Sequence, residues 1–542
     1  MKETLRTDPG GETGQSKGGP HGPLKRRWLR IRVTGVPARR SVMLTAMTVG
    51  VGWTAILVAR LFAGGVVGLA DQGDGRRLLC SFGVASSRPW AADSNAFLYY
   101  LWRPHEWYGE TCGADGSGEP YHSSQALVLG AAKWLGQTFG LAQGIDLRIA
   151  GVVAACVLGA TLGVIVLLLP GALGFRMVFA SAVGLVIADS AFAGFLISPY
   201  SEPAAFMGVV SLGAALLFMW RKGDATAGGV AAVAVVALFA ITSTTRMLSL
   251  VVPVVVALVW TPVRAERRAS GRHGLRRTPG RNGRLTGWLR RRWIAILAAL
   301  AIVAGSLGYW ASQPQRFEAM NSYNAIFVEM LPHSPDPAGD LRWFGLDPGL
   351  VSASGSRIDS PNSVARGPQW DDFKSKVSAG AVAEFYVTHP GRWLGLLSRT
   401  VDGMTRPTLG YLGSYPADAG EPPFAKERRI TVATSVLEFW GVAPALLLLV
   451  LAATLILGLL TAAREVCSPP GRALGRLAAI TVIAAVTQAG AVILTEGSSE
   501  LYKHMIVADL LVLLCVPLAC GCVYVLTSST ARTTGGFLET AT

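Results

Sequence analysis

The chain has 542 residues, of which 51% are hydrophobic and only 15% are charged. Its mean hydropathy of +0.41 excludes an ordinary water-soluble protein and favours one embedded in a lipid bilayer. The net charge of +15 would also suit a nucleic-acid-binding protein, so the positions of the basic residues have to decide between the two classes.

The basic residues gather beside apolar runs. Ten Lys and Arg lie in residues 1–40, before the first apolar run, and eleven Arg lie in residues 264–292. Such clusters are typical of the cytoplasmic flanks of transmembrane helices. We therefore expect a lipid bilayer as a partner and no nucleic acid. Residues 1–40 are too long and too polar for the start of a cleaved signal peptide, so we expect a disordered cytoplasmic tail.

Ten apolar runs approach or reach the length of about 20 residues that a membrane-spanning helix needs. Threading them alternately, with the N-terminus in the cytoplasm, places the basic connections on the cytoplasmic side. The sequence thus predicts an all-α polytopic integral membrane protein of the cell membrane, with both termini cytoplasmic. The runs are residues 42–61, 149–169, 177–197, 204–220, 229–241, 248–263, 293–311, 440–461, 477–495 and 505–526.

The fifth and sixth runs are shorter than a full span. We interpret them as a helical hairpin whose tip, residues 242–246, ends below the outer surface and lines a cavity. Two tilted helices would explain the same lengths.

Two connections are too long to be turns, and we expect both outside the cell. In the first, residues 94–102 and 124–139 have near-helical apolar spacing and predict helices on the membrane surface, with Ser123 and Ser124 as N-cap residues. The predicted organisation is a tail (1–40), a seven-helix module (41–311) containing the exterior loop 71–148 and the basic cytoplasmic loop 264–292, a second exterior loop region (312–434), three helices (435–526) and a cytoplasmic tail (527–542).

Cys80 and Cys112 both fall in the first exterior loop. An oxidising compartment permits a disulfide there, and spacing and compartment leave pairing and non-pairing equally open.

The layout of one helix, a long exterior loop, six more helices and a second long exterior loop resembles the GT-C glycosyltransferase superfamily. Five short stretches are similar to the bacterial family of glycan biosynthesis hexose transferases. One difference lies at the hairpin tip, where that family has a Lys and this chain has Arg246. The similar stretches are residues 73–77, 198–202, 321–327, 385–390 and 496–504.

The resemblance implies transfer of a hexose from a polyprenyl-phosphate donor to a cell-envelope glycan or glycoprotein acceptor outside the membrane. It also implies that an acidic residue of the first exterior loop is the catalytic base. Two alternatives stay open: a transporter or flippase of a lipid-linked glycan, and a non-catalytic envelope-assembly protein.

Asp74 is our candidate for the base. It lies a few residues beyond the first predicted helix, at the depth of a lipid-linked head group, and its carboxylate can take the proton of an attacking hydroxyl. The other interpretation is a turn in which Asp74 is hydrogen-bonded beside Asp71 and the neighbouring glycines. Asp93 is the second candidate.

Basic residues at the same predicted depth are candidates for binding the donor phosphate, because guanidinium and ammonium groups match phosphate oxygens. Binding of lipid head groups and structural ion pairs, such as one between Arg246 and Asp509, are the alternatives. The candidates are Arg76, Arg77, Arg246, Lys503 and His504.

Tyr200, Glu202 and Glu500 are candidates for binding the sugar or the acceptor, since they lie at predicted outer helix ends. For Glu202 a solvated helix cap is the alternative, because Pro203 follows it at the start of a helix. The chain has no Asp-x-Asp triplet, so we predict no cofactor and no obligatory metal, without excluding a divalent cation.

Overall fold

The computed structural model describes residues 39–86, 97–106, 121–142, 144–261, 281–314 and 316–539. All of them belong to one compact unit, Pro37–Thr542. The predicted tail before residue 39, the two candidates Asp93 and Cys112 and residues 262–280 of the basic loop lie outside the described residues.

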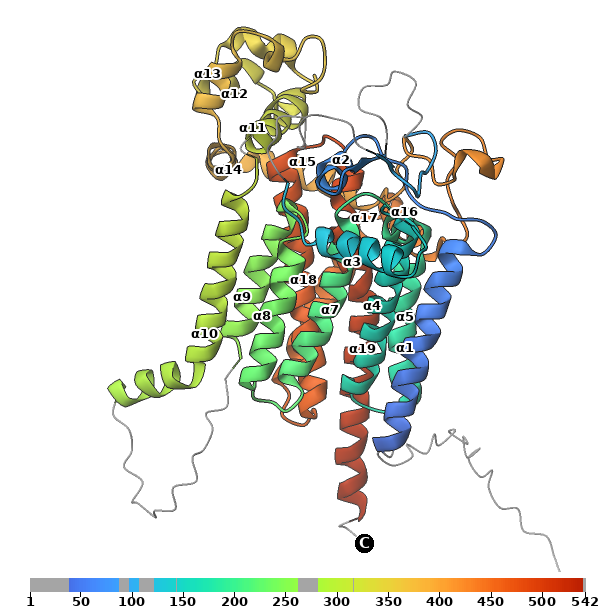
Figure 1. Cartoon of the computed structure of the whole chain (residues 1–542). Helices are drawn as coiled ribbons and strands as arrows, with labels where there is room; N and C mark the ends of the chain where they lie inside the picture. Colours follow the sequence, from blue (N-terminus) through green and yellow to red (C-terminus); the bar gives the residue numbers. More distant parts are fainter. Residues whose placement is uncertain are drawn as a thin grey trace, which may run out of the picture. The chain divides into compact units, whose positions relative to one another are not determined.

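Within the described residues, seven helices are long and apolar enough to cross a membrane. Figure 1 shows them side by side in a bundle, with the two long connections at the same end, which we call the loop end. The seven are α1 (Arg39–Phe62), α4 (Leu147–Leu168), α7 (Glu202–Trp220), α10 (Arg281–Ala311), α17 (Pro444–Ala463), α18 (Pro469–Glu496) and α19 (Leu501–Glu539).

The third apolar run is a broken helix. α5 (Leu173–Ala188) and α6 (Ser190–Leu196) meet at an angle of 73°, and counting the pair as one span raises the number of spans to eight. Asp189 makes the break, because its backbone is extended and its carboxylate accepts hydrogen bonds from the amides of Ala191, at 3.0 Å, and Ala433, at 2.7 Å. The carboxylate thus caps α6 and the first turn of α16 (Val432–Val442) together.

The fifth and sixth runs form a short hairpin, as expected from their length. It consists of α8 (Ala227–Ile241), η2 (Thr245–Leu250) and α9 (Val251–Val259), which are too short to be counted as spans. The first long connection contacts the tip just before its surface helix, since the Ser123 hydroxyl donates to the Ser243 carbonyl at 2.5 Å. The predicted count of about ten transmembrane helices is therefore not confirmed, although each predicted run coincides with helical structure.

The first long connection contains one surface helix and little other regular structure. α3 (Gln125–Thr138) matches the predicted helix, and its Leu127 and Trp134 are 68% and 64% exposed. Ser124 does not cap it with its side chain, because the hydroxyl donates to Phe239 instead. The other elements are α2 (Arg76–Leu79), η1 (Cys80–Phe82) and the antiparallel pair β1 (Val84–Ala85) and β2 (His105–Glu106), with Val84 opposite Glu106.

The helix predicted at residues 94–102 is wrong for its described part. Residues 97–102 are turns and extended chain. The Tyr100 amide donates to the Tyr415 carbonyl at 2.8 Å, and the Gly413 amide donates to Phe97 at 3.0 Å. Pairing with the second long connection has replaced the helical hydrogen bonds of this segment.

The second long connection folds into short helices around an aromatic cluster. Tyr323 stacks on Phe327 with ring centroids 4.6 Å apart, and Trp370 stacks on Phe373 at 5.3 Å. Besides α16, its elements are α11 (Arg316–Tyr323), η3 (Asn324–Met330), η4 (Leu331–His333), α12 (Pro337–Trp343), η5 (Pro348–Ala353), η6 (Val364–Arg366), α13 (Trp370–Lys376), α14 (Ala379–Thr388), η7 (Pro390–Arg392), α15 (Trp393–Met404) and η8 (Ala417–Ala419).

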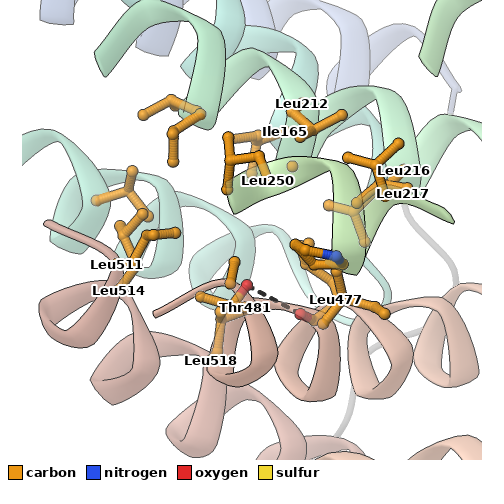
Figure 2. Close-up of a pocket in the computed structure, with 18 of the residues that line it drawn as sticks. Ile165, Leu212, Leu216, Leu217, Leu250, Leu477, Thr481, Leu511, Leu514 and Leu518 are labelled. Atoms are coloured by element: carbon orange, nitrogen blue, oxygen red, sulfur yellow. Dashed lines mark hydrogen bonds between the residues drawn. The ribbon is translucent and has the colours of Figure 1, made fainter. Parts of the chain in front are cut away.

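The centre of the bundle encloses a small apolar cavity of about 70 Å³. Figure 2 shows its leucines, among them Leu250, Leu477 and Leu511, pointing into it from different helices. The one labelled hydroxyl, that of Thr481, is turned away to its own helix, where it donates to the Leu477 carbonyl at 2.9 Å. This region is therefore built for packing between helices.

Candidate functional site

A polar cavity of about 1040 Å³ opens at the loop end. Helices α7, α18 and α19 contribute residues from their ends, and both long connections, the hairpin tip and the turns before α7 and α19 contribute the rest. Of the predicted site residues, this cavity brings together Asp74, Arg77, Tyr200, Glu202, Arg246, Glu500, Lys503 and His504.

A tight turn presents Asp74 to the cavity. The Asp71 carboxylate accepts from the amides of Gly73, at 2.8 Å, and Gly75, at 2.9 Å. Gly73 has φ of 116°, which side chains rarely adopt, and a Cβ on Gly75 would lie 2.5 Å from that of Pro199. The turn interpretation thus applies to Asp71, which leaves the Asp74 side chain directed to other partners.

Asp74 lies among cationic and amide partners. One of its oxygens is 3.0 Å from the Arg77 guanidinium, and the other forms an ion pair with Lys503 and accepts from Gln72 at 3.3 Å. Burial alone would raise the pKa of Asp74, but Arg77 and Lys503 outweigh it and hold the pKa well below its usual range. Asp74 is therefore ionised at neutral pH.

Lys503 is almost completely buried, with 2% of its surface exposed. Its ammonium lies 4.5 Å from the centre of the Tyr200 ring and 3.7 Å from the Glu500 carboxylate. The Tyr200 hydroxyl in turn donates to the Ala70 carbonyl at 2.8 Å. One face of Tyr200 is thus used for a cation–π contact, while stacking on a sugar ring stays a prediction.

A second group of charges lies beside the first. Arg246 contacts Glu202 at 2.8 Å and Glu496 at 3.7 Å, and Glu496 also pairs with His504. Glu202 is 2% exposed, so it is not a solvated cap. Because two carboxylates already neutralise Arg246, a structural ion pair explains its position, and phosphate binding by Arg246 stays a prediction.

The turn between α18 and α19 brings Glu500 to the cavity. Gly497 has φ of 60°, and a Cβ there would lie 2.7 Å from the Asn324 carbonyl, so this close approach requires glycine. The Glu500 carboxylate accepts from Gln72 at 2.7 Å and lies 3.5 Å from Arg357 of the second connection. Glu500 thus links the two long connections.

The remaining candidates lie elsewhere. Arg76 and Cys80 do not line the cavity. Cys80 is disulfide-bonded, but its expected partner Cys112 is outside the described residues, so their pairing stays a prediction, as does the role of Asp93.

The suggested pair of Arg246 with Asp509 is wrong. Arg246 contacts Glu202 and Glu496 instead. Asp509 is fully buried in α19, and neither carboxylate oxygen has a hydrogen-bond partner among the described residues. Asp509 does not line the polar cavity to which Arg246 belongs.

Several lining residues were not selected from the sequence. Gln72 directly precedes the stretch 73–77 and Glu496 begins the stretch 496–504, so proximity to Asp74 and to the turn before α19 would have found them. Arg357 and Tyr411 come from the second connection, where nothing in the sequence distinguishes them from other loop residues.

The cavity combines carboxylates with nearly as many cations. Such a site can bind a polar, phosphate-bearing ligand and accept a proton from it. In the described part of the chain, no three His, Cys, Asp or Glu side chains are grouped to hold a metal ion. The charged lining residues are Asp74, Glu202, Asp359, Asp402, Glu496 and Glu500, with Arg77, Arg246, Arg357, Arg399 and Lys503.

Comparison with known proteins gives one match. No curated protein and no solved structure matches the chain. The model of a transmembrane-domain family matches residues 34–535, which include all seven spans and the whole polar cavity. The match shows that the chain is a multi-pass membrane protein. The narrower resemblance to hexose transferases stays a prediction. The chain belongs to the family of the YfdI N-terminal transmembrane domain.

Proposed function

We propose that this protein is a GT-C-type glycosyltransferase that moves a hexose from a polyprenyl-phosphate donor to a cell-envelope acceptor on the outer side of the plasma membrane. The observation that best supports this proposal is the position of the ionised Asp74, which lines a large polar cavity next to cations at the end of the transmembrane helices. The family match supports a membrane protein of this general kind.

The proposed reaction is a single displacement. The acceptor hydroxyl oxygen attacks the anomeric carbon, the bond from that carbon to the phosphate oxygen breaks, and its electron pair leaves with the phosphate. The hydroxyl proton passes to the Asp74 carboxylate. A carboxylate with a lowered pKa is a weak base, so the proton is transferred after the new bond has formed. The same low pKa keeps Asp74 deprotonated at neutral pH and therefore ready to accept that proton.

Arg77 and Arg357 are the best placed cations for the donor phosphate. All four cations contact carboxylates, but the side chains of Arg77 and Arg357 are 30% and 56% exposed, whereas those of Lys503 and Arg246 are only 2% and 12% exposed. Arg77 also lies over the Phe317 ring at 4.7 Å, which directs its guanidinium into the cavity. Lys503 then has a different role, that of holding Asp74 in position.

The test is transfer of radiolabelled hexose from polyprenyl phosphate in membranes that contain or lack the protein. We expect Asp74→Asn to lower transfer at least about 1,000-fold while expression and membrane insertion stay normal, because the amide cannot accept the proton. The matched control is Asp371→Asn, which changes an exposed residue of α13 that pairs with Lys374. Full transfer by Asp74→Asn would remove this residue from the mechanism.

The orientation is tested separately. Topology reporters fused at Ser117, Ser354 and Gly280 should report outside, outside and inside. A cytoplasmic signal at Ser117 or Ser354 would place the cavity on the wrong side for the proposed donor. A flippase would instead move an unaltered lipid-linked glycan across proteoliposomes and leave its sugar bound to phosphate.

A further inference from the structure

A second polar cavity, of about 430 Å³, lies at the loop end between α6, α16 and two connecting segments. It shares no lining residue with the cavity of Asp74. Between them, two segments are paired by hydrogen bonds from the Gly68 amide to Ser414, at 3.0 Å, and from Ala70 to Gly413, at 2.8 Å. The second cavity is therefore a separate compartment.

The cationic side chains of this cavity lack carboxylate partners. Glu427 is neutralised by the buried Arg60. Lys426 and Arg428, by contrast, form no ion pair with any described residue, and the one hydrogen bond of the Lys426 ammonium goes to the Leu412 carbonyl. Partial burial lowers the pKa of Lys426 to about 8. An anion entering the cavity would supply the missing counter-charge.

The hydroxyl groups of the cavity add unused donors. Thr408, Ser414 and Thr431 line it, and their side chains make no hydrogen bond to another described residue. Glu438 is the one lining carboxylate without a cation, and it is exposed. Apart from Glu427, which is paired with Arg60, the cavity thus has two cations and several hydroxyls but one carboxylate. This excess of donors and positive charge suits the binding of phosphate oxygens.

Helix α16 has a polar stripe beside an apolar one. Thr434, Ser435 and Glu438 follow each other at helical spacing and line the cavity. Val432 and Phe439 lie on the adjacent face, 56% and 57% exposed, as expected of side chains in contact with acyl chains. An amphiphile would place its head group against the first stripe and its chain along the second.

We propose that this cavity binds the phosphate head group of an anionic lipid, at a site distinct from the transferase cavity. Lys426 and Arg428 contact the phosphate, and the hydroxyls of the cavity donate to its remaining oxygens. The ligand is a lipid rather than free phosphate because the cavity lies just beyond the end of α1 and beside the apolar stripe of α16. This site does not depend on the protein's being a glycosyltransferase.

The test measures acylation of Lys426 by an amine-reactive reagent at pH 8, read by mass spectrometry of the full-length protein in nanodiscs. Phosphatidylglycerol added to phosphatidylcholine should slow acylation of Lys426 at least about fivefold, as expected of a ligand in excess over its Kd. Lys374, an exposed lysine outside both cavities, is the reference within the same sample and should react at one rate in both lipids.

Two further arms make the test decisive. Arg428→Gln should reduce the protection to less than about twofold, since one of two phosphate contacts is lost, whereas the matched Arg342→Gln, exposed and outside both cavities, should leave it unchanged. Equal acylation rates in the two lipids, or full protection in Arg428→Gln, would overturn the site. Equal protection by inorganic phosphate in phosphatidylcholine nanodiscs would overturn its assignment to a lipid.

Discussion

Three long helices, α7, α18 and α19, contribute to both the apolar cavity in the bundle and the polar cavity of Asp74. Their side chains in the apolar cavity are mostly aliphatic, whereas Glu202, Glu496 and Lys503 line the polar cavity nearer the helix ends. Along each of these helices, the side chains thus change from apolar packing residues to charged residues of the candidate site. The bundle fixes the helices, and their ends together define the polar site.

The two cavities also differ in how they respond to a lost side chain. In the apolar cavity a truncation removes van der Waals contacts, and its cost depends on how far the neighbours can relax. In the polar cavity it leaves a charged partner uncompensated, which costs more where the partner is buried. Substitutions in each region therefore separate packing from function.

After Asp74→Asn, the largest effect is expected for Lys503→Met. It removes the buried cation that pairs with Asp74, so we expect transfer to fall at least about 100-fold, as on removal of a preorganised charge from an active site. The broken pair should also destabilise the protein by up to about 3 kcal/mol. Transfer kinetics and thermal unfolding of the purified protein measure the two effects.

Lys503→Arg is the control, because it keeps a cation next to Asp74. Partial recovery of transfer in Lys503→Arg is expected. If Lys503→Met unfolds at the same temperature as the wild type and transfers sugar normally, the polar network is not the functional centre, and the comparison of the two cavities fails.

A packing substitution should show the reverse pattern. Leu217 lines the apolar cavity from α7 and is 1% exposed. We expect Leu217→Ala to destabilise the protein by about 2 kcal/mol, while transfer per folded molecule stays within about twofold of the wild type. Leu217→Met conserves volume and should show neither change. A tenfold loss of transfer without loss of thermal stability would mean that the apolar cavity belongs to the substrate path.

The acid limb of the pH profile should depend on Arg77. Since Arg77 is the strongest of the charges that lower the pKa of Asp74, Arg77→Gln raises that pKa towards its ordinary value. Because the pKa of Asp74 is lower in the folded protein than its unfolded value of 3.8, the ionised carboxylate stabilises the fold above that pH. This stabilisation is lost as the pH falls through the folded-state pKa. Transfer and thermal stability should therefore decline at a pH about one unit higher in Arg77→Gln.

Both proteins keep His504, Glu496 and Glu500, but Arg77 also lowers the pKa of Glu496, so part of the shift in the acid limb belongs to that carboxylate. Identical acid limbs for the wild type and Arg77→Gln would show that protonation of Asp74 does not limit transfer.

Most of the membrane architecture could be predicted from the sequence, because a bilayer demands long apolar helices and each run coincides with helical structure. The bend at Asp189 was missed, since an apolar run does not show that one carboxylate caps two helices. The predicted helix at residues 94–102 was wrong for residues 97–102, because this segment pairs with residues 413–415 from far along the chain.

The candidate site was predictable in part for a related reason. Charged residues at the ends of transmembrane helices are forced to a common depth, so Asp74, Glu202, Arg246 and Lys503 could be grouped from sequence alone. A shared depth does not show which side chains meet, so Asp509 was paired with Arg246, which contacts Glu202 and Glu496 instead. The contribution of Arg357 requires the fold of the second connection, which has no periodic pattern.

The smallest effect, and the sharpest probe of the cavity mouth, is expected for Arg357→Gln. Arg357 is 56% exposed and pairs weakly with Glu500 and Asp359, so its loss should leave thermal stability unchanged. If it contacts the donor phosphate, KM for the donor should rise about three- to tenfold at constant kcat, because the contact is equally strong in the ground and transition states. Arg366→Gln, which changes an exposed arginine outside the cavity, should alter neither constant. A change in kcat alone would assign Arg357 to the reaction step, and an unchanged KM would leave Arg77 as the phosphate contact at the mouth.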